Sequence, residues 1–324
     1  MMAGAIAHEL AFRPAAPEDA AFAADVMTAV APASPWDPVS LRYWWSQPDE
    51  SLEFARFIVL RDGRAAGFAQ IEHARWELQP ERYASLRAEL WPADRTRDAL
   101  SAAIGGVEER ARADGARILR LTAGEDDDLR IDVILGRGYG EDRRHRRWEL
   151  DLVANRGHVL RMTDASRARM RAEGVELLTL ADDHDPDVVK KVWLLSEEAG
   201  DDVPTTMPRI PEAMESYVRW THAPEIHRDR FWIARVHDQV VGVSVLGYPP
   251  VRGVVGTEWT ATARSVRGRG IARALKCETL AQAIALGVDR VRTGNDEANV
   301  PILHINETMG YRLGPSTIGY LRPA

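Results

Sequence analysis

The chain has 324 residues, of which 45% are hydrophobic and 28% charged, a composition typical of a folded globular protein of about two domains. Its net charge of −7 provides no overall positive field for a phosphate backbone, so we expect no nucleic-acid partner. Cys277 is the only cysteine, which excludes an internal disulfide, and no residues show metal-ligand spacing, so we expect no bound metal.

The N-terminal segment and the lack of long apolar runs bear on location. No apolar run approaches the roughly 18 residues needed to cross a bilayer, so we expect no membrane partner. The first residues lack a basic start and include Glu9 where a signal peptide would be apolar. The sequence therefore predicts a cytoplasmic protein, either a monomer or a homodimer.

The first half of the chain begins with a short apolar strand at 9–15 and a helix at 17–30, followed by a second helical stretch. Two apolar runs separated by Asp-Gly within 56–71 predict an antiparallel hairpin. The second half shows the same order after residue 174, with hairpin strands at 231–236 and 240–248. The chain thus repeats one series of elements.

The second copy continues with a strand at 256–263, a glycine-rich turn and a long amphipathic helix at 271–287. A strand at 288–293, a helix at 300–310 and a closing strand at 316–321 complete it. The glycines and the Gly-Tyr pairs of the two copies lie in one register. The sequence therefore predicts two domains with the same order of elements.

The spacing between the copies is constant. Gly115 and Gly287, and likewise Tyr139 and Tyr311, lie 172 positions apart. Such a repeat predicts two copies of one fold rather than one large domain.

The repeat also sets the predicted domain boundaries. We expect a first domain over 1–153 and a second over 173–324. The polar segment 154–172 belongs to neither copy and is predicted to be the interdomain linker.

The glycine-rich turn of the second copy carries the strongest chemical signal. Gly268 and Gly270 leave backbone N–H groups unshielded at the positive end of a helix dipole, which suits a diphosphate-sized anion. Arg267 and Arg269 add positive charge at its rim. A plain tight turn is the alternative interpretation. A Rossmann motif is excluded because Arg273 occupies the position of its third glycine.

This order of elements resembles the GNAT superfamily of N-acetyltransferases, whose pyrophosphate-binding turn has the pattern Q/R-x-x-G-x-G/A. Arg267, Gly270 and Ala272 match that pattern. The segment TGNDEANVPILHINETMGYR resembles the family's fifth strand, its cofactor-facing loop and the helix that follows. The resemblance covers 175–324 well and 8–152 more loosely. It implies an α/β (α+β) fold with two GNAT-like domains, each a mixed, mostly antiparallel twisted sheet flanked by helices.

The resemblance implies acetyl-CoA as cosubstrate, with its pyrophosphate on the turn, its pantetheine along the strand before the turn and Asn299 near the pantetheine or thioester end. The candidate cofactor-binding residues are Thr260, Ala261, Thr262, Arg267, Gly268, Arg269, Gly270, Ile271, Ala272, Asn295 and Asn299.

The first copy departs from this pattern at the turn. Thr96 stands in register with Gly268, and Asp98 stands in register with Gly270. A side chain there blocks close approach of the backbone, and a carboxylate repels a pyrophosphate. The first domain is therefore predicted to be a degenerate, structural copy.

Glu258 is the candidate general base for an attacking amine. It shares a parity with Thr260 and Thr262 on the strand that enters the turn, so all three side chains are predicted to face the cleft. The alternative is an edge carboxylate in solvent.

The general acid is harder to assign. Many GNAT enzymes carry a helix tyrosine that protonates the departing thiolate, and Asn306 stands at the matching position here. Tyr311 and Tyr320 are the remaining candidate donors, with core packing as the alternative for Tyr311.

The acceptor is expected to bind at the acidic loop 196–214, by resemblance. Its Asp201 and Asp202 favour a cationic amine, and a solvated helix end is the alternative. We therefore predict an acetyl-CoA-dependent N-acetyltransferase that transfers directly to a primary amine of a small cationic molecule, with the second domain active. The alternative function is a non-catalytic acyl-CoA-binding or scaffold protein.

Overall fold

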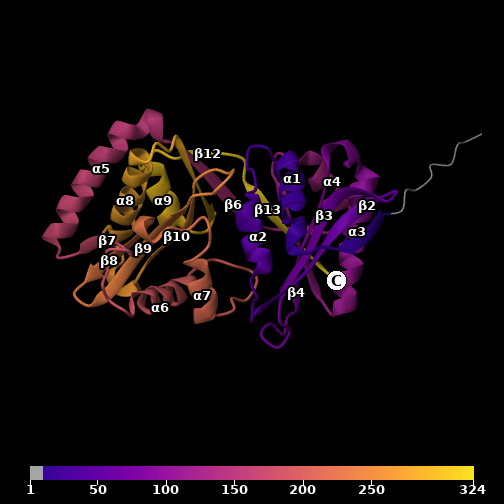
Figure 1. Ribbon diagram of the computed structural model, residues 1–324, viewed down its shortest axis with the longest axis horizontal. Helices are drawn as coiled ribbons and strands as arrows, with labels where there is room; N and C mark the ends of the chain where they lie inside the picture. Colours follow the sequence, from indigo (N-terminus) through magenta and orange to yellow (C-terminus); the bar gives the residue numbers. More distant parts are fainter. Residues whose placement is uncertain (1–9) are drawn as a thin grey trace, which may run out of the picture. The chain divides into compact units, whose positions relative to one another are not determined.

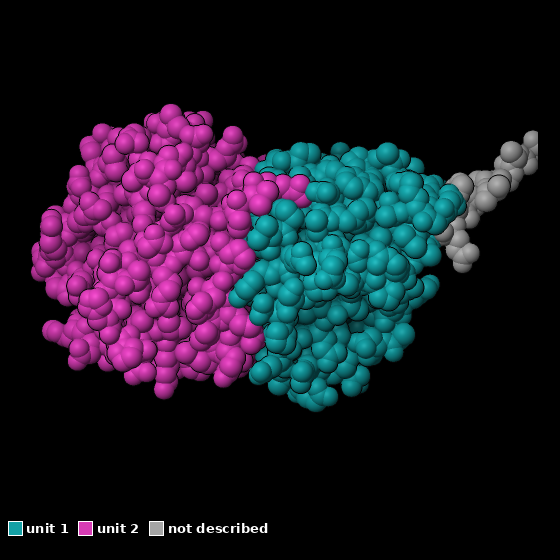
Figure 2. All heavy atoms as spheres, viewed as in Figure 1, with its two compact units in different colours: residues 1–142, 318–324 teal, residues 143–317 magenta. Residues whose placement is uncertain are grey.

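A computed structural model describes residues 10–324 of the chain. The N-terminal segment with Glu9, on which the predicted cytoplasmic location partly depends, lies outside the described residues. The chain forms two compact units, coloured separately in Figure 2. The first extends to Asp142 and also includes Ile318–Ala324, and the second comprises Arg143–Thr317.

The first unit is one sheet with helices on both faces (Figure 1). Its strand order is β1-β2-β3-β4-β5-β13, with β1 to β4 antiparallel and β4 parallel to β5. Its strands are β1 (Leu10–Pro14), β2 (Leu52–Arg61), β3 (Arg64–Ala74), β4 (Tyr83–Leu90), β5 (Ile118–Gly124) and, from residue 318 on, β13 (Thr317–Pro323). Its helices are α1 (Ala20–Val30), α2 (Pro38–Ser46), α3 (Arg97–Asp114) and α4 (Asp128–Gly136).

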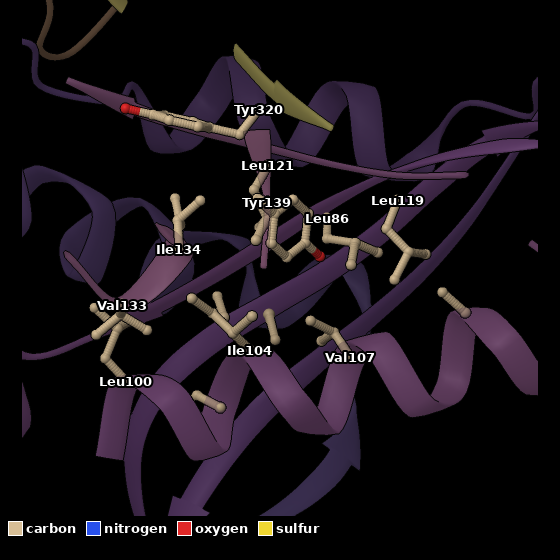
Figure 3. Close-up of a cluster of buried hydrophobic side chains, with 14 of the residues drawn as sticks. Leu86, Leu100, Ile104, Val107, Leu119, Leu121, Val133, Ile134, Tyr139 and Tyr320 are labelled. Carbon is tan, nitrogen blue, oxygen red and sulfur yellow. The ribbon is translucent and has the colours of Figure 1, made fainter. Parts of the chain in front are cut away.

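The core of the first unit forms where α3 packs on the sheet. The Thr96 side chain caps the first turn of α3, and Gly115 ends the helix in the left-handed conformation. Apolar residues recur along one side of α3 at helical spacing and point toward the strands, as Figure 3 shows. The buried residues labelled there are Leu86, Leu100, Ile104, Val107, Leu119, Leu121, Val133, Ile134, Tyr139 and Tyr320.

The second unit repeats this architecture, with strand order β7-β8-β9-β10-β11-β6 and β12 paired to β6. Neighbours are antiparallel except for β10 and β11. Its strands are β6 (Gly140–Asp151, from residue 143 on), β7 (Glu176–Thr179), β8 (Phe231–Val236), β9 (Gln239–Gly247), β10 (Gly256–Thr262), β11 (Arg290–Asp296) and β12 (Arg312–Leu313). Its helices are α5 (Leu152–Ala172), α6 (Val188–Gly200), α7 (Met214–Trp220), α8 (Ile271–Ala285) and α9 (Val300–Thr308). The mixed, mostly antiparallel sheet flanked by helices in each unit confirms the predicted fold class.

The segment predicted to be a linker, 154–172, is instead most of α5, which lies along α8 in the second unit (Figure 1). The Thr163 hydroxyl donates to the carbonyl oxygen of Cys277 at 3.2 Å. Arg167 donates to both carboxylate oxygens of Glu278 at 2.7 Å. Because polar side chains of α5 make contacts with α8, this helix packs with few apolar residues. Its sequence therefore resembles that of a loop.

The predicted repeat is present in the secondary structure. β5 and β11 are offset by 172 positions at both ends, and so are α4 and α9. The closing strands, however, do not stay with their own copies. Most of β6 follows the first copy in sequence but belongs to the second unit, and β13 ends the second copy but belongs to the first unit. The unit boundaries therefore differ from the predicted 1–153 and 173–324, because periodicity does not indicate which sheet a closing strand joins.

Candidate active site

The turn between β10 and α8 has a backbone that requires glycine. Gly268 has a φ of +79° and Gly270 a φ of +85°, in the left-handed region where side chains are strained. A Cβ atom on Gly270 would also lie 3.1 Å from Nη1 of Arg169 on α5. The two glycines thus allow a backbone conformation that would be strained with other residues.

This turn leaves the N-terminus of α8 open. Gly270 is the N-cap residue, and no side chain caps the helix there. Its first N–H groups are therefore unsatisfied by the helix and lie at the positive end of its dipole. Nη1 of Arg267 lies 2.7 Å from Oδ2 of Asp202, and Nε of Arg269 lies 3.1 Å from Oε2 of Glu173. These pairs hold two guanidinium groups beside an end suited to a diphosphate.

The equivalent turn of the first unit is closed. Thr96 has a φ of −92°, and its hydroxyl accepts a hydrogen bond from the N–H of Ala99 at 3.2 Å. In the constant register, α3 begins two residues earlier than α8. Asp98 consequently lies in the first helical turn, where Gly270 of the second unit forms the N-cap. An anion is disfavoured at the N-terminus of α3, because a side chain already caps it and the first turn carries a carboxylate.

Strands β10 and β11 separate on the way to the turn. Their parallel pairing is confined to Gly256 with Arg292, and within residues 10–324 the later part of β10 pairs only with β9. One backbone edge of β10, along Thr260 to Thr262, therefore lacks a strand partner in the described residues and can pair with an extended ligand. The Thr260 hydroxyl shares a hydrogen bond of 2.9 Å with Ser244, and the Thr262 carbonyl accepts one from Arg267 at 3.3 Å.

The other predicted cofactor residues lie on β10, β11, α8 and at the start of α9. Ala261 and Ile271 have buried side chains, so only their backbone groups can face a ligand. Ala272 is half-buried in the first turn of α8. Asn299 is the N-cap of α9, and Asn295 lies near the end of β11. The turn thus directly follows β10 and leads into α8.

Glu258 lies at a β-bulge. The register of β10 against β9 shifts between Thr257 and Trp259, which makes Glu258 the inserted residue. A Cβ atom on Gly247 of β9 would lie 2.5 Å from Oε1 of Glu258, so the carboxylate lies over that glycine. The bulge breaks the predicted parity: Thr260 follows the shift and does not share the face of Glu258. The prediction of one common face was wrong because a strict alternation cannot include an inserted residue.

The environment of Glu258 makes it a weaker acid than usual. Glu258 is an exposed residue of β10, but its carboxylate lies against the backbone of Gly247. This desolvation, together with the nearby carboxylate of Glu225, raises the pKa of Glu258 to about 7. A carboxylate with this pKa is suited to exchanging protons near neutral pH.

Comparison with known proteins identifies the second unit. The sequence model of the acetyltransferase (GNAT) family matches residues 195–311, which include the end of α6, the bulged strand, the turn and α9. This segment is a GNAT acetyltransferase domain. The chain therefore carries an acyltransferase domain, and the family of that domain transfers acyl groups from acyl-CoA.

Solved structures extend the similarity to the whole chain. A tandem GNAT protein from the clavulanic acid biosynthesis pathway has a TM-score of 0.75 and 17% identity, covering 97% of this chain and 98% of that one. A GCN5-related N-acetyltransferase from Sphaerobacter thermophilus has a TM-score of 0.66 and 18% identity, covering 97% and 95%. At these identities the likeness shows the fold, which is a tandem GNAT fold. No curated protein matches the chain.

The GNAT domain has no tyrosine at the family's usual position for the acid. Asn306 is fully buried on α9, and its Nδ2 donates to Oδ1 of Asn295 at 2.8 Å. Tyr311 is buried in the core of the second unit, where desolvation raises the pKa of its hydroxyl, and that hydroxyl lies near Thr257. Tyr311 thus packs as the aromatic member of the Gly-Tyr pair.

Tyr320 requires a correction. It was predicted as an alternative donor in the second domain, but it lies on β13 in the core of the first unit (Figure 3). The exchange of the closing strands removes it from the core of the GNAT domain, because β13 joins the other sheet.

The aspartates of the acidic loop are paired with arginines. Asp202 receives hydrogen bonds from Arg264 and pairs with Arg267, and these two guanidinium groups lower the pKa of Asp202 to about 2. Oδ1 of Asp201 lies 2.9 Å from Nη1 of Arg209. Much of the negative charge expected to attract a cation is thus already balanced by arginines.

Three residues of this region were not singled out from the sequence. Arg169 comes from the supposed linker, and Glu225 acts on Glu258 from the loop after α7. Lys276 is fully buried in α8, although it is one of only three lysines in the chain, which was a usable signal.

No helix in residues 10–324 is long and apolar enough to cross a membrane. The same residues contain no group of three or more His, Cys, Asp or Glu placed to hold a metal.

Proposed function

We propose that the second unit is an N-acetyltransferase that uses acetyl-CoA and acetylates a primary amine of a small cationic molecule directly. The observation that carries the proposal is the left-handed Gly268 to Gly270 turn at the uncapped N-terminus of α8, next to the strand with Glu258. The first unit, with its self-capped α3, serves as a structural copy.

The residues present fit the cosubstrate. The N–H groups at the start of α8 would hold the pyrophosphate, with Arg267 and Arg269 beside it. The unpartnered edge of β10 from Thr260 to Thr262 would pair with the amide groups of the pantetheine. The acyl-CoA supplies the activated acyl group, and the protein positions it.

Glu258 would prepare the acceptor. An amine attacks only when neutral, and a carboxylate with a pKa of about 7 can accept its proton directly or through a water molecule. The C–N bond forms as the C–S bond breaks, the amine proton passes to Glu258, and CoA leaves as a thiolate that takes a proton from solvent. Asn306 has no titratable proton and can contribute only a hydrogen bond.

The acceptor selectivity would come from Glu258 and Glu225. Both carboxylates lie in the same region, and their mutual repulsion is relieved when a cationic amine approaches. Asp201 and Asp202 would act indirectly by holding Arg209 and Arg267 in place. A small molecule with more than one amino group fits this charge pattern.

The test is release of CoA thiol from acetyl-CoA with spermidine, glucosamine and a lysine-containing peptide as acceptors. We expect release with at least one of them, and loss of that activity in Glu258→Gln with acetyl-CoA binding retained. Glu176→Gln, an exposed change on β7, is the matched control and should leave the rate unchanged. Binding of acetyl-CoA without turnover for every acceptor would contradict the proposal.

A further inference from the structure

The first unit has one sheet face that its helices leave partly open. In β4 and β5, alternate residues such as Leu86 and Leu119 are buried against α3, and the residues between them are half-buried on the opposite face. On that opposite face, Met27 of α1 and Trp45 of α2 cover the sheet at Phe68 of β3. The open part of this face begins at Gln70, the next residue of β3 on the same side.

Charged residues from four strands meet on this open face. The register places Arg56 beside Gln70, and Gln70 beside Arg87, so these residues form a row across β2, β3 and β4. In a neighbouring row, Ser85 of β4 lies between Glu72 of β3 and Arg120 of β5. We call this set the polar patch: Arg56, Gln70, Glu72, Ser85, Arg87 and Arg120.

Hydrogen bonds connect the rows of the polar patch. Nε of Arg56 donates to Oε1 of Gln70 at 3.3 Å, and Nε2 of Gln70 donates to Oε2 of Glu72 at 3.3 Å. Nη1 of Arg87 donates to the sulfur of Met27 at 3.2 Å, a weak acceptor. The side chains are therefore ordered, yet a strong acceptor for Arg87 is missing from the described residues.

Aromatic rings border the polar patch. The guanidinium carbon of Arg87 lies 4.8 Å from the ring centroid of Trp36, and that of Arg56 lies 4.4 Å from the ring centroid of Phe54. Trp36 is 37% exposed and Phe54 is 36% exposed. Such stacking holds the planar guanidinium groups beside partly exposed aromatic rings.

The charges of the polar patch do not balance. It holds three guanidinium groups and one carboxylate, and none of its arginines has a carboxylate oxygen within 4.0 Å among residues 10–324. The nearby Glu89 is paired with Arg130 at 3.2 Å. Burial lowers the pKa of Arg56 to about 10, which reflects how poorly this charge is solvated. Three half-buried cations that share one carboxylate favour the binding of an anion.

We propose that the polar patch of the first unit binds a small carboxylate-bearing molecule with a planar apolar part. A carboxylate matches the planar fork of a guanidinium in a bidentate pair, which Arg87 and Arg120 can offer. The planar remainder would lie against Trp36 and Phe54. This site lies within the first unit and does not depend on the acetyltransferase reaction.

The experiment measures binding of benzoate to the full chain by isothermal titration, with the neutral benzamide as matched ligand. We expect saturable binding of benzoate, none of benzamide, and at least a tenfold loss of affinity in Arg87→Met. Arg97→Met, on the exposed side of α3 where Arg97 pairs with Asp132, should bind like the unmodified chain. Arg87→Lys keeps the charge and should bind with intermediate affinity, which separates loss of the ligand contact from loss of folding.

Two results would overturn the proposal: no saturable binding of benzoate by the unmodified chain, or equal affinity in Arg87→Met. Tighter binding of inorganic phosphate than of benzoate would also contradict it, because it would indicate a phosphate site. Loss of acetyl transfer in Glu258→Gln leaves benzoate binding unchanged, so failure of one proposal is distinguishable from failure of the other.

Discussion

Replacing Lys276 by methionine should stabilise the second unit. Lys276 is 1% exposed, and its Nζ has no hydrogen-bond partner within the described chain. The nearest compensation is the ring of Tyr311, whose centroid lies 5.3 Å from Nζ. Methionine has a similar length, fits the same space and carries no charge.

The magnitude follows from the pKa of Lys276. Burial lowers it from 10.5 to about 8, which corresponds to about 3 kcal/mol of unfavourable free energy when the group must be charged. The unfolded chain binds this proton more tightly than the folded one. The penalty is therefore complete below pH 8 and is relieved as the pH rises toward 10.5. Loss of the cation–π contact offsets about 1 kcal/mol, which leaves a net gain of about 2 kcal/mol at pH 7.

Urea unfolding followed by circular dichroism at pH 7 and pH 10 measures this effect. We expect Lys276→Met to unfold at higher urea than the unmodified chain at pH 7, and the difference to shrink to below about 1 kcal/mol at pH 10. Lys190→Met, an exposed change on α6, is the matched control and should shift neither midpoint. A lower midpoint for Lys276→Met at both pH values would refute the reasoning, because it would mean that the ammonium group stabilises the fold.

Further predictions concern the site itself. The rate of acetyl transfer should rise with pH through about 7 as Glu258 ionises, and in Glu258→Gln this rise should disappear and the rate fall by about 100-fold, as a pH profile of kcat/KM would show. Gly247→Val should lower the rate in the same way, because its Cβ would meet Oε1 of Glu258 at 2.5 Å, while acetyl-CoA affinity measured by titration stays unchanged. Asp202→Asn should release Arg264 and Arg267 and raise KM for acetyl-CoA several-fold with kcat nearly constant, whereas an unchanged KM would mean that the pairs do not position the turn.

The repeat and the turn were predictable because both depend on local sequence. A constant offset of glycines follows from equal element lengths, and β5 and β11 confirm it. The left-handed conformations of Gly268 and Gly270 follow from the one residue type that adopts them readily.

The exchange of β6 and β13 was not predictable, since either strand has the same pattern in either sheet. The bulge at Glu258 changes which side chains share a face, and the residue types along the strand do not indicate where the inserted residue lies. Asp202 pairs with Arg267, far along the chain, so the composition of the loop alone overstated its free negative charge. The side-chain contacts of the site and the bulge thus needed the structure, while the glycine turn did not.

The central claim is that the chain has one acetyl-CoA site, formed by the turn before α8. Isothermal titration of acetyl-CoA into the unmodified chain, Gly270→Asp and Asp98→Ala tests it directly. The prediction is one acetyl-CoA per chain in the unmodified protein and in Asp98→Ala, and no measurable binding in Gly270→Asp. Two molecules per chain, or undiminished binding in Gly270→Asp, would contradict the claim.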